Sequence, residues 1–328
     1  MSILYADVDW QPLIDVLDQA KQIHIIAHVC PDADTIGSQL ALYHGLKCMG
    51  KKVLMHNRDT SPYLCRYLAA VNDITYGEIP AIVAASDVVI AVDAGSLSRL
   101  GMETAYFEGK TLINIDHHAS NTCYGTMNIV DARYCATGAM IYDLLQHLKV
   151  DLCAASAAAI YAAVLTDTAS FRLANVTASV HRMVADLIEA GADVQKAAQS
   201  IYQSHKAARF ELLKYALDSL HIGDHGRTSW LSVRRDLYQK TGLSGEDSEG
   251  FIDYARSIEG VDVAVFIREE DEQVWKVSLR GKPPCNVGYL AEKLGGGGHQ
   301  YAAGCTLYGT EHAVQEEIKR ILPDILTP

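Results

Sequence analysis

The sequence lacks the features that mark exported, membrane-spanning or disulfide-bonded proteins. Its first residues contain neither a basic segment nor an apolar core, so we expect no signal peptide. The uncharged stretch Leu152–Thr166 is too short for a membrane span and rich in alanine, which predicts a buried helix. No two of the eight cysteines have C-x-x-C spacing, so we expect reduced thiols that pack as small apolar groups. These absences predict a cytoplasmic protein without a membrane partner.

A surplus of positive charge is also missing. The chain has 28 Lys and Arg against 40 Asp and Glu, which gives a net charge of −12. Proteins that bind long nucleic acid duplexes usually present a basic face to the phosphate backbone. We therefore expect no long duplex as a partner. If the substrate is a nucleic acid, it is a short one held by a few local contacts.

The length and periodicity of the chain predict two α/β domains. At roughly 100–200 residues per domain, 328 residues suggest two, and the pattern changes near residue 205, which divides the chain into 1–204 and 205–328. In the first part, β-branched runs alternate with helical patterns, which predicts a mainly parallel sheet flanked by helices. The predicted strands of this sheet are Ile23–His28, Lys52–His56, Val88–Asp93 and Leu112–Asp116.

Helical patterns separate and follow these strands. The predicted helices include Ser38–Met49, Ala154–Leu165 and Ala178–Glu189, the last of them capped by Thr177 and ended by Gly191. In the second part, alternating runs predict a smaller α/β domain with a mixed sheet. Its predicted strands are Ser229–Val233, Val261–Ile267 and Val274–Leu279.

The first group of chemically active residues follows the first predicted strand, in the segment HVCPDADTIG. Pro31 and Gly37 are expected to shape a tight loop that brings His28, Asp32 and Asp34 into one small volume. Because the two carboxylates are two residues apart, they could serve two adjacent metal ions. An ordinary polar loop, with Asp as turn former and helix cap, explains this group equally well.

Two further groups end predicted buried strands. Asp93 closes the run VVIAVD, where the cost of desolvating a carboxylate favours a partner cation. Asp116, His117 and His118 end the run LINID. Adjacent His side chains on an extended segment point in opposite directions, so one can bind metal while Asp116 fixes a His tautomer. A carboxylate that only caps the next turn is the alternative for Asp93.

A last carboxylate completes the pattern. Asp167 emerges from the C-terminal end of a predicted helix, where the helix dipole disfavours a negative charge unless a cation is near. An exposed Asp just past the helix end is the alternative. Carboxylate and imidazole ligands without thiolate suit manganese, with magnesium or cobalt as alternatives. Two divalent ions that share one bridging carboxylate could use the full set, which is His28, Asp32, Asp34, Asp93, His117 and Asp167.

Near the C-terminus the segment GGGGHQYAAG is expected to form a glycine-rich loop that offers an anion site. The backbone of Gly296, Gly297 and Gly298 can approach a ligand closely and offer N–H groups to it, and His299 ends the run. Arg280, upstream in the chain, can grip a phosphate in bidentate fashion. A flexible glycine loop with a solvated arginine is the alternative.

In the order and spacing of these motifs the sequence resembles the DHH phosphoesterase superfamily, which is named for the triplet Asp116-His117-His118. The glycine-rich segment is similar to the C-terminal substrate-binding domain of the branch that contains RecJ-type nucleases and stand-alone nano-RNases. In size and layout the chain is most similar to bacterial oligoribonucleases that also act on 3′-phosphoadenosine-5′-phosphate (pAp). It departs from the common family pattern at Cys30, Ala33 and Ala169, none of which is a ligand.

This resemblance implies how the two ions are shared. His28 and Asp32 would hold one ion, and Asp93 would bridge both. His118 would lie beside the reacting phosphate as a catalytic residue, with Asp116 as its partner. The ligands of the other ion would be Asp34, His117 and Asp167, and the contacts to the substrate would come from Arg280, His299 and the glycines 296–298.

The expected reaction is metal-assisted hydrolysis of phosphate esters in short oligoribonucleotides, in dinucleotides such as pApA or in pAp, with the second domain closing over the substrate. Other readings are a cyclic-dinucleotide phosphodiesterase, an inorganic pyrophosphatase or polyphosphatase, and a catalytically silent nucleotide-binding regulator. The sequence does not distinguish among the short substrates, and it leaves the polarity of cleavage, the native metal and a homodimer open.

Overall fold

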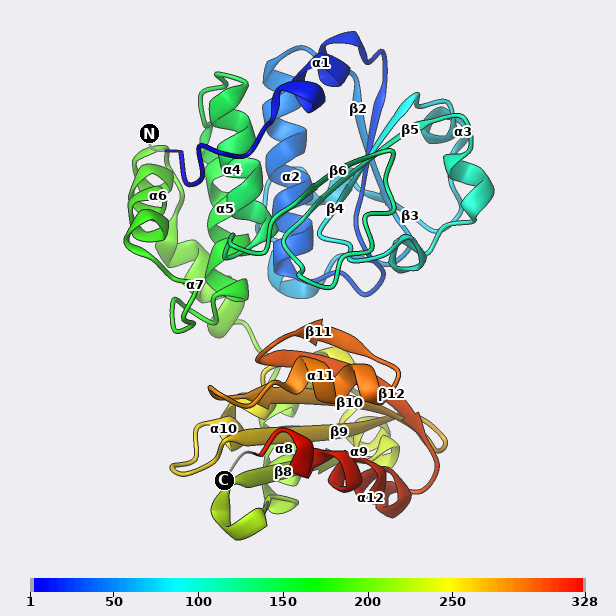
Figure 1. Cartoon of the computed structure of the whole chain (residues 1–328), viewed down its shortest axis with the longest axis vertical. Coiled ribbons are helices and arrows are strands. Elements are labelled where there is room, and N and C mark those ends of the chain that lie inside the picture. The colour runs from blue at the N-terminus through cyan, green and yellow to red at the C-terminus, as the bar shows by residue number, and fades with distance from the viewer. Residues whose placement is uncertain (1–2, 327–328) are drawn as a thin grey trace. The chain divides into compact units, whose positions relative to one another are not determined.

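The computed structural model describes residues 3–326, and the chain divides into two compact units, Met1–Ser204 and His205–Pro328 (Figure 1). Each unit contains one six-stranded sheet and its own apolar core. Within the described residues, no helix is both long and apolar enough to cross a membrane.

The sheet of the first unit is entirely parallel, as the alternation of strands and helices predicts. Its order is β3-β2-β1-β4-β5-β6. From β1 the chain proceeds toward one edge of the sheet and from β4 toward the other edge, so the strand order reverses between the central strands β1 and β4. Ligands of open parallel sheets bind at such a reversal, beyond the carboxyl ends of the strands. The strands are β1 (Ile23–Ile26), β2 (Val53–Asn57), β3 (Thr75–Tyr76), β4 (Val88–Val92), β5 (Thr111–Asp116) and β6 (Met127–Val130).

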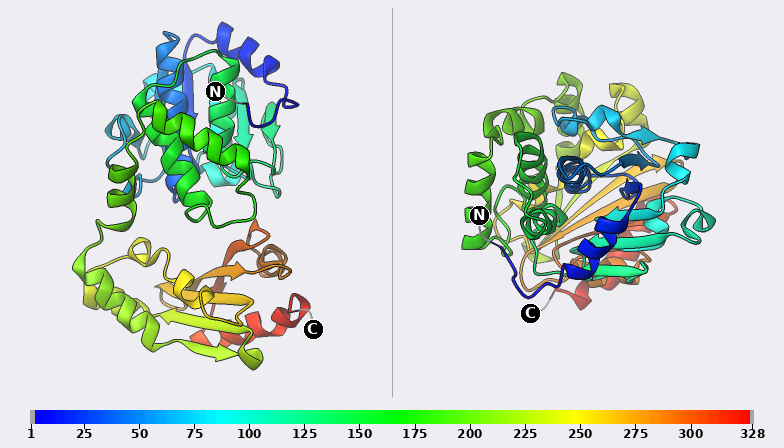
Figure 2. Two further views of the ribbon diagram at one scale, coloured as in Figure 1. Left: turned by 90° about the vertical axis from the view of Figure 1, so that its left-hand side faces the viewer. Right: turned by 90° about the horizontal axis from the view of Figure 1, so that it is seen from above.

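Long helices cover one face of this sheet, and short helical segments cover the other. Figures 1 and 2 show α4, α5, α6 and α7 gathered on one side of the sheet, where α2, α4 and α5 pack together. The opposite face packs against the short segments Leu97–Leu100 and Thr104–Phe107. The helices of this unit are α1 (Gln11–Gln19), α2 (Ala33–Cys48), α3 (Ala81–Ala84), α4 (Thr137–His147), α5 (Ala154–Asp167), α6 (Ala178–Glu189) and α7 (Val194–Tyr202).

Helix α2 begins earlier than the sequence predicts, and this corrects the expected loop around Gly37. The Asp32 side chain caps the helix by accepting a hydrogen bond from the Thr35 amide, so helical structure starts at Ala33. Gly37 therefore lies inside the helix, where a Cβ would come within 2.4 Å of the Ala159 carbonyl oxygen in α5. The glycine serves the close packing of two helices and does not shape a loop.

A buried histidine lies in the central strand β1 of the first unit. His24 is fully buried in β1, with Nδ1 at 2.6 Å from the Tyr106 hydroxyl and Nε2 at 3.0 Å from the His56 carbonyl oxygen. Burial lowers its pKa from 6.5 to about 3, despite the opposing effect of the bond to His56. The folded chain thus keeps His24 neutral at pH values where an unfolded chain would protonate it.

We expect His24 to make the first unit sensitive to acid. The stability that neutral His24 contributes is fully present above pH 6.5. As the pH falls, this contribution is lost by about 1.4 kcal/mol per pH unit until the pKa of His24 in the folded chain is reached. In a His24→Gln variant this contribution disappears, so its free energy of unfolding should fall less steeply between pH 7 and pH 5. Urea unfolding at several pH values measures both slopes. Equal slopes in the two proteins would show that His24 does not contribute.

The second unit has a mixed sheet with helices on both faces. Its order is β11-β12-β10-β9-β8-β7, and every neighbouring pair is antiparallel except β8 and β9. The helices are α8 (Ala207–Asp218), α9 (Arg235–Thr241), α10 (Ile252–Arg256), α11 (Val287–Lys293) and α12 (Glu311–Ile321). The strands are β7 (His221–Gly223), β8 (Thr228–Val233), β9 (Val263–Asp271), β10 (Val274–Gly281), β11 (Gly297–His299) and β12 (Ala302–Tyr308).

Candidate metal centre and active site

The first group of possible ligands lies where the chain reverses between β1 and β4. His28 follows β1, Asp32 caps α2 and Asp93 follows β4, and one ligand atom of each lies within 4.8 Å of the others. The His28 Nδ1 atom lies 2.7 Å from the Val29 carbonyl oxygen, so a proton on Nδ1 has an acceptor there. Nε2 then presents its lone pair toward Asp93, whose Oδ2 atom is 3.6 Å away.

A second group of possible ligands adjoins the first. Asp34 in α2, His117 after β5 and Asp167 at the end of α5 each place one ligand atom within 4.8 Å of the others. His117 has its Nδ1 atom 3.2 Å from the Tyr134 carbonyl oxygen, which leaves Nε2 for the site. From Nε2 the distances are 3.7 Å to Asp34 Oδ2 and 3.4 Å to Asp167 Oδ2.

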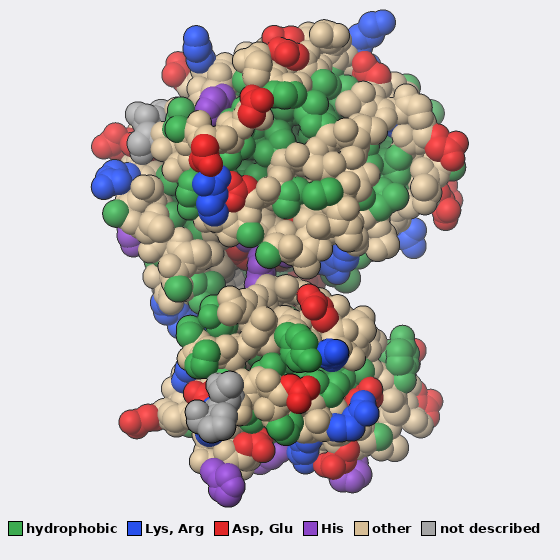
Figure 3. All heavy atoms as spheres, in the orientation of Figure 1, with side chains coloured by type: hydrophobic (Ala, Val, Ile, Leu, Met, Phe, Trp, Pro, Cys, Tyr) green, Lys and Arg blue, Asp and Glu red, His purple; other side chains and the backbone are tan. Residues whose placement is uncertain are grey.

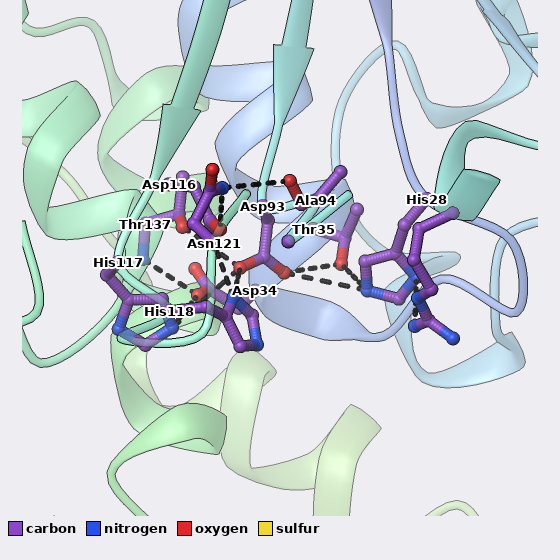
Figure 4. Close-up of polar contacts among 12 residues, drawn as sticks. His28, Asp34, Thr35, Asp93, Ala94, Asp116, His117, His118, Asn121 and Thr137 are labelled. Carbon is purple, nitrogen blue, oxygen red and sulfur yellow. Dashed lines mark hydrogen bonds and ion pairs between the residues drawn. The ribbon is translucent and has the colours of Figure 1, made fainter. Parts of the chain in front are cut away.

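Asp93 lies between the two groups and faces each with one oxygen (Figure 4). Its Oδ2 atom faces His28, and its Oδ1 atom is 3.8 Å from His117 Nε2 and 3.7 Å from His118 Nδ1. The residue is almost fully buried, and its backbone has a left-handed conformation with φ of 61°. Residues other than glycine adopt this conformation at a cost, and such strain is concentrated at functional sites.

The two groups fit divalent cations. Asp34 and Asp93 are both about 2% exposed, and charges so close together in a buried site need cations between them. The N···O distances of 3.4–3.8 Å within and between the groups are longer than hydrogen bonds. They are short enough for both atoms to contact one ion with bonds of about 2.0–2.2 Å. The set contains nitrogen and oxygen donors without thiolate, which suits manganese or similar ions.

His118 lies beside these groups and is held there by Asp116. Its Nδ1 atom lies 2.6 Å from Asp116 Oδ1, and the other oxygen of Asp116 accepts a hydrogen bond from the Asn121 side chain. Asn121 also donates to the Ala94 carbonyl oxygen at 3.1 Å, so it ties the triplet to the segment after β4. Asp116 is fully buried, and its position fixes the ring of His118.

The protonation of these side chains reflects the crowding of carboxylates. Burial alone would lower the pKa of His118, but the bond to Asp116 and the charges of Asp93, Asp116 and Asp167 outweigh it and raise the pKa to about 10. Burial and the nearby charges of Asp93 and Asp167 raise the pKa of Asp34 well above its usual range. Burial also acts to raise the pKa of Asp93, yet contacts with His28, His118 and His117 lower it overall. Of these two carboxylates, Asp93 is therefore the one that favours the charged form.

Three polar residues that the sequence analysis did not identify complete the site. The Thr35 hydroxyl lies 2.7 Å from both His28 Nε2 and Asp93 Oδ2. The Thr137 hydroxyl donates to Asp93 Oδ1 at 2.9 Å, and the Thr137 and Gly138 amides at the start of α4 donate to Asp34. Asn121 is the third. Only Asn121 could have been suspected from the sequence, because it follows the DHH triplet by three residues. The threonines could not, because they contact partners that are distant in sequence.

In the second unit, strand register places Arg280 and His299 on one face of the sheet. Arg280 in β10 pairs with Ala302 in β12, and Ala302 pairs with His299 in β11. Paired residues of antiparallel strands share a face, so the arginine and the histidine lie two strands apart, roughly 10 Å, across a small alanine. Both side chains are partly exposed. By contrast, Lys282 donates to the Ile258 carbonyl oxygen and does not extend this row.

The glycine-rich segment is mostly strand, which corrects the expected loop. A Cβ on Gly296 would lie 2.1 Å from the Gly304 carbonyl oxygen, and one on Gly298 would lie 2.6 Å from the Ala303 Cα. These two glycines allow β11 to pack closely on β12, so their presence does not itself indicate a ligand. Gly297 differs, because a Cβ there would meet nothing within 4 Å. Its backbone is open beside the row that contains Arg280 and His299.

Comparisons with known proteins give matches along most of the chain. The model of the DHH family, N-terminal domain, matches residues 22–164, and the model of the DHHA1 domain matches residues 233–325. The bifunctional oligoribonuclease and PAP phosphatase NrnA of Thermus thermophilus is 34% identical over 310 residues, which cover 91% of this chain and 90% of that protein.

Solved structures share the fold. An exopolyphosphatase-related protein from Bacteroides fragilis matches with a TM-score of 0.90 at 24% identity, over the full length of both chains. RecJ from Thermus thermophilus, in complex with Mn²⁺, matches with a TM-score of 0.51 at 14% identity, over 97% of this chain and 54% of that one. At these identities the likeness concerns the arrangement of helices and strands.

Proposed function

The chain belongs to the DHH family, and from this premise we propose that it hydrolyses phosphate esters in short oligoribonucleotides and in pAp. The observation that carries the proposal is the pair of adjacent ligand groups with Asp93 between them, and with His118 held beside them by Asp116. The similarity to a bifunctional oligoribonuclease and PAP phosphatase over nine-tenths of both chains supports the substrate class.

We propose that two divalent ions, Mn²⁺ in preference to Mg²⁺ or Co²⁺, bind these groups. Such ions supply Lewis-acid stabilisation to a phosphate and to the water that attacks it. His28 and Asp32 hold one ion, and Asp93 contacts both. The second ion takes its remaining ligands from Asp34, His117 and Asp167, which the amides of Thr137 and Gly138 support through Asp34.

His118 has the properties of a proton donor to the leaving ribose oxygen. Its contact with Asp116 keeps a proton on Nδ1, and the surrounding carboxylates favour a second proton on the ring. Cations bound to the same carboxylates would offset part of that charge and lower the pKa of His118 toward the range useful for acid catalysis. Asn121 acts as a positioning residue because it holds Asp116 from the other side.

We propose that the second unit binds the end of the substrate through Arg280, His299 and the open backbone at Gly297. The arginine supplies a bidentate contact to a terminal phosphate, and the small Ala302 leaves space for a nucleotide between Arg280 and His299. On the face drawn in Figure 3, the coloured Lys and Arg side chains are interspersed with Asp and Glu and form no continuous track. An end contact of this kind favours short substrates over long ones.

Removal of Arg280 should therefore weaken the use of short substrates. We expect Arg280→Ala to lower kcat/KM for a dinucleotide about tenfold to a hundredfold, since a charge-assisted contact contributes roughly 1.5–3 kcal/mol. Arg320→Ala is the control, because it removes the same charge from α12. The buried residues Val314 and Ile318 of this helix belong to the core on the opposite face of the sheet, so the change should have no such effect. Wild type should also prefer the dinucleotide to a 20-nucleotide strand. Equal cleavage of both lengths, unchanged by Arg280→Ala, contradicts end binding.

A substrate panel tests the proposed function as a whole. With manganese present, we expect turnover of a 5′-phosphorylated dinucleotide and of pAp, and little or none of pyrophosphate, polyphosphate or a cyclic dinucleotide. Turnover restricted to pyrophosphate or polyphosphate would place the chain in another branch of the family. Binding of nucleotides without turnover of any compound would favour a regulatory role.

A further inference from the structure

Arg99 lies in a short segment that connects the two parts of the active site. This segment follows Asp93 and includes the helical turn Leu97–Leu100. At its start, the Gly95 carbonyl oxygen accepts a hydrogen bond from the Thr122 amide, which belongs to the loop after the DHH triplet. At its end, the Arg99 carbonyl oxygen accepts one from the Val29 amide at 2.7 Å, next to His28. The backbone of Arg99 is thus fixed against the loop that carries His28.

The guanidinium group of Arg99 has no carboxylate partner among residues 3–326, although it lies beside an acidic site. Some arginines of the chain do pair with carboxylates, such as Arg133 with Asp131 and Arg268 with Glu249. The side chain of Arg99 is exposed, and within residues 3–326 its only polar contact is between Nη2 and His28 Nδ1, at 3.2 Å. A guanidinium group in such a place is suited to bind an anion from solution.

The contact between Arg99 and His28 does not satisfy the guanidinium group when the ring proton of His28 is on Nδ1. Ligation through Nε2 requires the ring proton on Nδ1, where the Val29 carbonyl oxygen accepts it. A protonated Nδ1 cannot accept a hydrogen bond from Arg99. With the proton on Nδ1 the guanidinium group has no protein acceptor, and it lies beside the His28 ring, where it can bind an oxygen of the substrate.

Gly95, at the other end of the segment, has no structural requirement to be glycine. Its φ is not in the left-handed region, and a Cβ would meet only Asp116 Oδ2 and the His118 Cβ, both at 4.0 Å. Among the described glycines only Gly297 shares this freedom, since every other one has a positive φ or would place a Cβ within 3.4 Å of a neighbour. A side chain at residue 95 would project into the space beside His118.

We propose that Arg99 is a catalytic residue that binds a non-bridging oxygen of the scissile phosphate, and that Gly95 keeps space for the leaving group beside His118. This proposal rests on the proposed phosphoesterase function and adds two substrate contacts to it. Arg99 supplies positive charge where negative charge develops during the attack on phosphorus. The rival explanation is that Arg99 only orients His28.

Binding of inorganic phosphate and binding of manganese separate these explanations. Arg58 provides a matched control, because it is also exposed, has no ion pair among residues 3–326 and lies near Gly101, just past Arg99. In titration calorimetry with the manganese-loaded full chain, we expect Arg99→Ala to raise the Kd for inorganic phosphate at least tenfold. Arg58→Ala should remain within about twofold of wild type. Arg99→Ala should bind manganese as tightly as wild type or more tightly, since a positive charge is removed.

Kinetics give the second readout. We expect Arg99→Ala to lower kcat/KM for a dinucleotide about 10²–10³-fold, and Arg99→Lys to recover only part of it because lysine lacks the bidentate geometry. Gly95→Ala should lower kcat/KM at least tenfold with an unchanged thermal midpoint. Phosphate binding by Arg99→Ala equal to wild type overturns the proposal, and so does a loss of manganese affinity that accounts for the whole effect. If wild type cleaves no dinucleotide, the proposed function is wrong. The phosphate titration still shows in that case whether Arg99 binds a phosphate oxygen.

Discussion

An Asp93→Asn variant should lose at least about a thousandfold in kcat/KM for a dinucleotide, which corresponds to about 4 kcal/mol of transition-state stabilisation. Asp93 is the residue whose two oxygens face His28 on one side and His117 on the other. A neutral amide at this position cannot bridge two cations, and the group of His28, Asp32 and Asp93 loses one of its carboxylates. The variant should bind fewer manganese ions per chain than wild type.

Asparagine is the informative replacement because it separates chemistry from backbone strain. Asn and Asp adopt the left-handed conformation found at residue 93 more readily than other residues, whereas Ala would add strain. The fold of Asp93→Asn should therefore remain intact, with a thermal midpoint at or above that of metal-free wild type. Asp131→Asn is the control, since Asp131 follows β6 at the same edge of the sheet outside both ligand groups. Near-normal turnover by Asp93→Asn contradicts the bridging role.

Removal of divalent ions should abolish turnover as completely as the loss of Asp93. After treatment with a chelator, we expect activity at background level and recovery when manganese is added. Calcium should restore much less, because it prefers more oxygen ligands at longer distances than a set with two histidines provides. Circular dichroism before and after chelation shows whether the fold is kept. Full activity in the presence of chelator is the result that this metal assignment does not allow.

Residues at the ends of long, apolar strands could be located from the sequence. The runs that became β1, β4 and β5 are continuous and buried, so their ends were visible, and with them the positions of His28, Asp93 and His117. The parallel sheet then brings these ends to one edge. The roles given to the individual ligands remain proposals, as does a cytoplasmic location.

Features that depend on packing could not be predicted. The edge strands β3, β6, β7 and β11 have only two to four residues and no clear alternation, so no strand was expected there. Gly37 was assigned to a loop because its partner Ala159 lies in a helix more than a hundred residues away. The same holds for Thr137, whose hydroxyl reaches Asp93 only after α4 packs beside α2. Contacts between residues so far apart in the chain produce no pattern in the local sequence.

The most direct test of this account counts manganese ions and follows turnover in the same titration. Metal-free full-length chain is titrated with manganese while bound ions and hydrolysis of a 5′-phosphorylated dinucleotide are measured. We predict two ions per chain in wild type, with turnover that rises as the second ion binds, and neither two-ion binding nor turnover in Asp93→Asn. Turnover that is complete with one ion per chain, or that does not depend on manganese, would contradict a two-ion centre built around Asp93.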